Sequence, residues 1–197
     1  MQASIIGNAN NINNQAFSFN EYIDFMGGFQ NVLAMGGMAD YGVGPGGQMG
    51  QRGITEQKSV GTNLNVDISK KFQMNANYLF AQSDRVLEES GSTQNFTDDK
   101  IFSTIDSMNV LTNTTNHRLN TKLKFNPNPR NNFTLNTRIF KLGNSDINNS
   151  MSDFWVDGIN ENMTLTNSKN ESSSFNLNTD LLYKKKFDKK TVTLSKI

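Results

Sequence analysis

TNLNVDISKKFQMNANYLF, residues 62–80, is the stretch that decides the fold class. On both sides of the Lys70–Lys71 pair, apolar side chains alternate with amides and other polar groups. Successive side chains of a β-strand point to opposite faces of its sheet, so this period of two predicts two strands joined by a tight turn. The apolar set is Leu64, Val66, Ile68, Phe72, Met74, Ala76, Tyr78 and Phe80. The opposite face is rich in amides. The fold class therefore depends on whether the apolar face contacts a protein core or lipid.

The same alternation returns along the chain and predicts an all-β fold, an antiparallel up-and-down meander. Short turns are expected at Lys70, Pro127 and Asp188, because their surroundings combine charged residues, asparagines or prolines. Residues 84–115 and 143–173 are polar and are predicted to be long external loops on the other side of the sheet, although a few apolar residues within 84–115 could extend the flanking strands. Strands are predicted near residues 2–9, 53–69, 72–83, 116–125, 133–142, 174–186 and 191–197.

One short helix is expected near residues 18–27. Ser18 followed three residues later by Glu21 fits a capping box, and two glycines end the apolar pattern. Residues 36–53 are glycine-rich and contain a GxGxxG spacing that begins at Gly42. Neither a buried strand before this spacing nor an amphipathic helix after it is present in the sequence, so a loop is predicted and nucleotide binding is not.

The composition excludes several classes of function. Asparagine supplies 30 of the 197 residues, which favours loops or a hydrated face over a conventional core. The formal net charge is +1, which gives no reason to expect nucleic acid as a partner. There is no cysteine, so a disulfide framework is ruled out.

No group of residues with catalytic or metal-binding chemistry stands out in the sequence. His117 is the only histidine, so a zinc site or a Cys–His dyad lacks ligands, and we expect a strand-end histidine in water. The acidic pairs Glu88–Glu89 and Asp98–Asp99 fit solvated loop residues better than a cation site. The chain is therefore expected to have no enzymatic activity, no cofactor and no metal.

Two environments for the apolar face remain open: lipid in a transmembrane β-barrel, or the core of a soluble antiparallel sandwich. No apolar run reaches the ~18 residues of a transmembrane helix, so a membrane fold must use strands. Aromatic residues lie close to the short turns, as in outer-membrane barrels, namely Phe72, Phe125, Phe133 and Phe187. The almost purely polar second face and the long predicted loops favour the barrel. The alternative is a soluble or surface-attached β-rich adhesin or binding module without catalysis.

On the barrel interpretation, the polar residues of the predicted strands face the lumen or a plug. The candidates are Asn63, Asn65, Asp67, Asn75, Asn77, Arg118, Lys122, Lys124 and Arg138. Leu79, Phe140 and Leu182 also point to this polar face. They indicate either bulges in the strands or contacts with something inside the barrel.

Three segments carry a resemblance to a known family: SIIGNANNINNQAFSFNEYIDFMGG, GPGGQMGQRGIT and GTNLNVDISKKFQMNANYLFAQSD. Together they resemble the outer-membrane β-barrel proteins related to TonB-dependent receptors, of the type with a carboxypeptidase-regulatory-like module before the plug. The resemblance spans nearly the whole chain, which would correspond to the early barrel strands.

The resemblance implies a barrel-wall segment of a transporter in the cell outer membrane that takes up an unknown solute. Its expected partners are outer-membrane lipid, the plug domain and remaining barrel strands of a longer parent chain and, through that parent, an energy-coupling TonB-type protein. The sequence has no recognisable plug, so we expect the chain to be a fragment of that longer protein.

Overall fold

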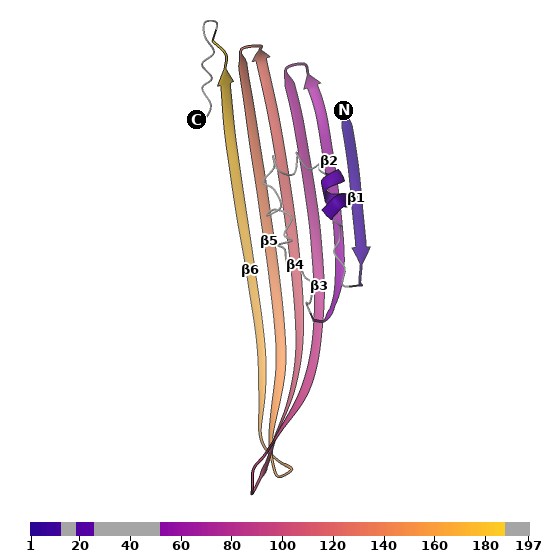
Figure 1. Cartoon of the computed structure of the whole chain (residues 1–197), viewed down its shortest axis with the longest axis vertical. Helices are drawn as coiled ribbons and strands as arrows, with labels where there is room; N and C mark the ends of the chain where they lie inside the picture. Colours follow the sequence, from indigo (N-terminus) through magenta and orange to yellow (C-terminus); the bar gives the residue numbers. More distant parts are fainter. Residues whose placement is uncertain (13–18, 26–51, 188–197) are drawn as a thin grey trace.

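A computed structural model of the chain describes residues 1–12, 19–25 and 52–187. Six strands form one sheet, and every pair of neighbours is antiparallel and consecutive in the sequence (Figure 1). The all-β up-and-down meander is therefore confirmed, and so is the short helix. Within the described residues the sheet is open, with β1 and β6 at its edges. The elements are β1 (Gln2–Asn10), α1 (Phe19–Phe25), β2 (Ile54–Ser69), β3 (Phe72–Phe96), β4 (Ile101–Asn128), β5 (Asn131–Val156) and β6 (Ile159–Lys185).

Two of the three predicted short turns lie at one end of the sheet (Figure 1). In the β2–β3 turn, the Ser69 hydroxyl accepts hydrogen bonds from the backbone N–H groups of Lys71 at 3.2 Å and Phe72 at 3.1 Å. In the β4–β5 turn, the Asn128 side-chain oxygen accepts from the N–H groups of Arg130 and Asn131 in the same way. We call this end the turn end. The predicted turn at Asp188 and the predicted strand at 191–197 lie outside the described residues.

The prediction of long loops at residues 84–115 and 143–173 is wrong. These segments continue the strands: β3 pairs with β4 without interruption from Phe72 opposite Phe125 to Phe96 opposite Ile101. The predicted strands 72–83, 116–125, 133–142 and 174–186 are therefore parts of much longer ones. Asparagine and serine suggested loops, but residues 84–115 also contain six threonines, whose β-branched side chains favour strands. Residues 143–173 contain only two threonines, and there the strands follow from backbone pairing with their neighbours.

Short turns also close the far end of the sheet. Thr97 and Lys100 join β3 to β4: the Thr97 N–H donates to the Lys100 carbonyl at 2.9 Å. Asp157 and Gly158 join β5 to β6 with φ of 48° and 82°, the left-handed conformation that a two-residue Asp–Gly hairpin turn uses. We call residues 83–115 and 143–174 the extension, because β3 to β6 continue there past Ile54, where β2 begins opposite Val86 (Figure 1).

Candidate functional site: the polar face of the sheet

All nine candidate residues lie on one face of the sheet, which we call the polar face. Residues opposite each other in an antiparallel pair share a face, so the register places the candidates directly. Asn63 is opposite Asn77, which is opposite Asn120. Arg138 on β5 lies opposite Asn120 and belongs to this row. Neighbouring rows of the same face contain Asn65 with Asn75 and Lys122, Asp67 with Lys124 through Gln73, and Arg118 opposite Leu79.

The asparagines of this face form hydrogen bonds across the strands. The Asn120 side-chain N–H₂ donates to the Asn77 side-chain oxygen at 2.9 Å, and Asn75 donates to Asn65. Asn63 and Asn77 are 7% and 5% exposed, so these are buried amides. A buried amide without a partner costs about 1–3 kcal/mol, so the cross-strand bonds are needed to keep this face folded.

Helix α1 covers part of the polar face. The Asn63 side-chain N–H₂ donates to the Phe25 carbonyl at 2.8 Å, and the Phe25 ring lies over Gly61. A Cβ atom at Gly61 would lie only 3.0 Å from Phe25 Cζ and 3.2 Å from Leu79 Cδ1. Among the described residues, Phe25 is the one hydrophobic side chain that is buried. The packing of α1 on the sheet therefore requires a glycine at position 61, because a side chain there would collide with the Phe25 ring.

This packing explains the apolar residues that point to the polar face. The register is unbroken at Leu79, Phe140 and Leu182, so bulges are not the reason for their placement. Leu79 contributes to the pocket that receives Phe25, and the Phe140 ring lies 5.2 Å from the Arg118 guanidinium carbon, a cation–π contact. The sequence offered two explanations, bulges or contacts. Contacts on the polar face explain the placement of Leu79 and Phe140.

A hollow near the turn end brings several candidates together. It has a volume of about 400 Å³, and the polar side chains that line it are Gln2, Asn65, Asp67, Gln73, Asn75, Lys122 and Lys124. Two ammonium groups and several amides can hold an anionic or hydrogen-bonding group of a solute or of another protein segment. Arg118 and Arg138 lie outside the hollow. Arg138 instead faces Asp180, with 3.8 Å between the guanidinium and carboxylate atoms.

The opposite face of the same strands is largely apolar, and its side chains are exposed or half-buried. Exposed fractions reach 41% for Val60, 58% for Leu177 and 51% for Leu181. We call this region the apolar band; it comprises Val60, Leu64, Val66, Phe72, Met74, Tyr78, Phe80, Leu119, Leu123, Phe125, Phe133, Leu135, Ile139, Phe175, Leu177, Leu181 and Tyr183. In β2 the usual arrangement is reversed, because the polar Thr55, Ser59 and Asn63 are buried and the apolar Val60 is not.

An aromatic row crosses four strands at the turn end of the apolar band. The ring centroids of Phe72 and Phe125, and of Phe125 and Phe133, are 6.3 Å apart, and those of Phe133 and Tyr183 are 4.6 Å apart. The first three aromatics were singled out from the sequence by their closeness to the turns. Tyr183 was missed as a member of the row, although the alternation of β6 places it on this face.

A second row of rings marks the other end of the band. The rings of Phe80 and His117 are 4.9 Å apart, and the Tyr78 hydroxyl and His117 Nδ1 are hydrogen-bonded at 2.8 Å. The expectation of a solvated histidine is therefore wrong: His117 is half-buried among aromatic side chains, because β4 continues past it.

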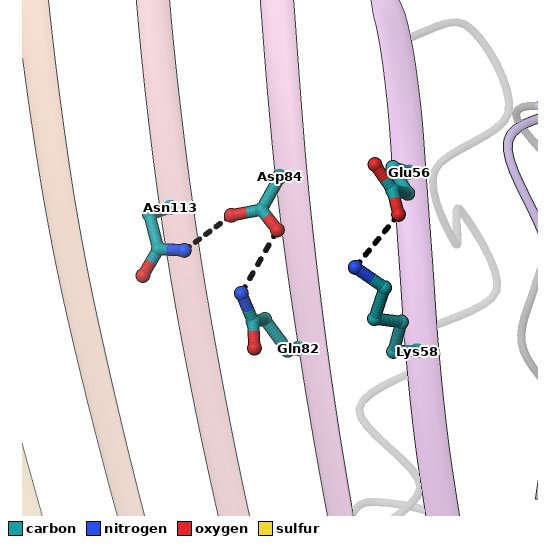
Figure 2. Close-up of polar contacts among 5 residues, drawn as sticks. All are labelled: Glu56, Lys58, Gln82, Asp84 and Asn113. Atoms are coloured by element: carbon teal, nitrogen blue, oxygen red, sulfur yellow. Dashed lines mark hydrogen bonds and ion pairs between the residues drawn. The ribbon is translucent and has the colours of Figure 1, made fainter. Parts of the chain in front are cut away.

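Beyond the second row, the same face becomes polar. Figure 2 shows the Lys58–Glu56 ion pair of 2.7 Å on β2, and the Asp84 carboxylate accepting from Gln82 at 2.9 Å and from Asn113. The hydrogen bond to Glu56 and its negative charge raise the pKa of Lys58 above its ordinary value. Lys58 is therefore charged at neutral pH. Two polar rows border the apolar band at this end, and one further apolar row, formed by Ile54, Val86, Leu111 and Ile147, lies beyond them.

In the part of the chain that the structure describes, no helix is long and apolar enough to cross a membrane, and no three acidic or histidine side chains are grouped so that they could hold a metal ion. Comparison of the chain with protein-family models, with curated proteins and with solved structures finds no match.

Proposed function

We propose that the chain is a wall segment of a TonB-dependent-receptor-like β-barrel in the outer membrane, which takes up a solute. The proposal rests on which side chains of the sheet are buried, because polar side chains are buried where a soluble protein would bury apolar ones. Thr55, Ser59, Asn63 and Asn77 are buried on one face, while the other face presents the apolar band, which is crossed by one row of threonines opposite Ala76. Soluble monomers rarely expose contiguous apolar patches larger than a few hundred Å², whereas a lipid bilayer covers such a surface.

The position of α1 favours the barrel over the soluble sandwich. In a sandwich, the element that packs on the sheet covers its apolar face. Here α1 packs on the polar face, and Asn63 holds its last residue, Phe25. A barrel interior tolerates amides and charges and can hold such an element, which agrees with this placement.

The height of the apolar band also supports the proposal. From Phe72 to Phe80 are eight residue steps, which at ~3.3 Å each give about 26 Å, or about 20 Å at a strand tilt of ~40°. The apolar belt of outer-membrane barrels is about 25 Å tall and has aromatic residues at both edges. The rows at Phe72 and Phe80 supply rings at both edges here.

The two faces would then have separate roles. The apolar band meets lipid, and the polar face lines the lumen or contacts the plug, where Lys122 and Lys124 present positive charge in the hollow near the turn end. The turn end corresponds to the periplasmic rim, because its turns follow directly after the apolar band, whereas at the other end β3 to β6 continue far beyond the band before they turn, as the extracellular parts of such barrels do. The extension then projects outward from the cell.

Membrane fractionation of cells that produce the protein tests this proposal. We expect the protein to sediment with outer membranes, to remain there through washes in high salt and in alkaline carbonate, and to be released only by detergent. A surface-attached binding module would be released by salt or carbonate. Such release would contradict the proposed function and favour the adhesin alternative.

A further inference from the structure

Charge is distributed unevenly along the strands. The extension contains eleven Asp and Glu residues but only three Lys and Arg residues. Residues 116–142, which lead into and out of the β4–β5 turn, contain six Lys and Arg residues and no acid. The net charge of +1 conceals this separation, and the extension is strongly acidic at neutral pH.

An open groove lies on the polar face of the extension. Its volume is about 690 Å³, and Arg52, Glu89, Asp106 and Met108 are among the residues that line it. Glu89, Met108, Ser150 and Thr166 form one row of the register, and Asp106 belongs to the next row. Opposite Asp106 lies Gly91, and a Cβ atom there would meet nothing within 4 Å. The groove therefore combines two carboxylates with open space beside them.

A guanidinium group of the chain itself already occupies this groove. Arg52 Nη1 lies 2.7 Å from Glu89 Oε1, although the two residues are 37 positions apart in the sequence. The Arg52 side chain is 78% exposed and that of Glu89 is 33% exposed, so the contact is made at the open surface and can be exchanged. Arg52 thus shows which kind of group Glu89 can bind: a planar cation that donates N–H hydrogen bonds to a carboxylate.

The spacing of the acids favours an extended cation over a single ion. Within residues 1–12, 19–25 and 52–187, no three acidic or histidine side chains converge on one point. Asp106 accepts a hydrogen bond from the Ser152 hydroxyl at 2.6 Å, so it is oriented in the groove and remains a separate contact point from Glu89. Met108 lies opposite Glu89, in the row next to that of Asp106, and offers an adaptable apolar surface to the methylene stem of a lysine or arginine.

We propose that this groove docks a basic segment of a partner polypeptide, with lysine or arginine side chains on Glu89 and Asp106, and that Arg52 competes for Glu89. Each exposed ion pair contributes little alone, so binding depends on several contacts made together. The inference uses only the extension and Arg52, and it does not depend on whether the apolar band meets lipid.

The test uses the purified protein and a fluorescein-labelled peptide of eight arginines, with binding followed by fluorescence anisotropy at low salt. The double variant Glu89→Gln/Asp106→Asn is expected to weaken binding about five- to tenfold. Arg52→Ala is expected to tighten binding about twofold, because it removes the internal competitor. The control Asp153→Asn/Glu171→Gln removes the same charge from the opposite face of the extension and should change binding by less than about twofold.

Three results would overturn the inference: no binding of the peptide, equal weakening by both double variants, or an Arg52→Ala variant that binds no tighter. Equal weakening would mean that the overall negative charge of the extension attracts the peptide and that the groove is not its binding site. Displacement of the peptide by calcium chloride, beyond that caused by sodium chloride of the same ionic strength, would identify a metal site instead. A protein that is released from membranes by salt but still binds the peptide would contradict the proposed function and leave this inference standing.

Discussion

Leu135→Arg is expected to destabilise the protein in lipid vesicles by about 2–4 kcal/mol, the cost of an arginine near the middle of the lipid-facing surface of a barrel. Leu135 lies in the apolar band, one row from its centre, opposite Leu123 and Leu181. In a bilayer its replacement places a charge in hydrocarbon. The measurement is the free energy of unfolding in denaturant, followed by tryptophan fluorescence of Trp155.

The matched control is Asn136→Arg, one residue along the same strand. Asn136 lies on the polar face opposite Asp180, where an arginine can remain hydrated and meet a carboxylate. Its effect is expected to stay within about 0.5 kcal/mol, the range of ordinary surface substitutions. If both variants behaved alike, Leu135 would not face lipid.

Gly61→Val is expected to cost about 1–3 kcal/mol, the usual penalty for overpacking a filled site. The new Cβ atom would approach Phe25 Cζ to 3.0 Å, Ile6 Cγ1 to 3.1 Å and Leu79 Cδ1 to 3.2 Å. We expect the added methyl groups to displace α1 from the polar face. The measurement is the shift in unfolding midpoint of the membrane-embedded protein.

Two further variants separate this packing effect from a general cost of losing a glycine. Gly7→Val places its Cβ 3.7 Å from the Ser59 carbonyl, an ordinary contact, and should cost much less. Phe25→Ala empties the space over Gly61, so the cost of Gly61→Val should shrink when both changes are combined. A Gly61→Val cost that is unchanged in the Phe25→Ala background would show that α1 does not rest on Gly61.

The period-two pattern was sufficient to predict the fold near the turn end. It predicted the hairpin of residues 62–80, the turns at Lys70 and Pro127, and the shared face of residues such as Asn63 and Lys122, because alternation depends only on the geometry of a strand. The helix was predictable from its own local signals, the capping residues and the glycines that follow.

The extension was missed because its strands lack apolar alternation. Backbone pairing, which composition does not report, continues through Ser- and Asn-rich sequence there. Asp157–Gly158 was a usable signal that was overlooked, since this dipeptide favours a two-residue hairpin turn. Contacts such as Phe25 on Gly61 and Arg52 with Glu89 join residues far apart in sequence, and no local pattern predicts them.

Labels on adjacent residues of β4 can distinguish a lipid-facing apolar band from a polar face that meets water. The chain has no cysteine, so Leu123→Cys and Lys122→Cys each provide one site for a nitroxide spin label. In outer-membrane vesicles, we expect oxygen, which concentrates in lipid, to relax the Leu123 label and a water-soluble nickel chelate to relax the Lys122 label. A Leu123 label as accessible to the nickel chelate as the Lys122 label would contradict a lipid-facing apolar band.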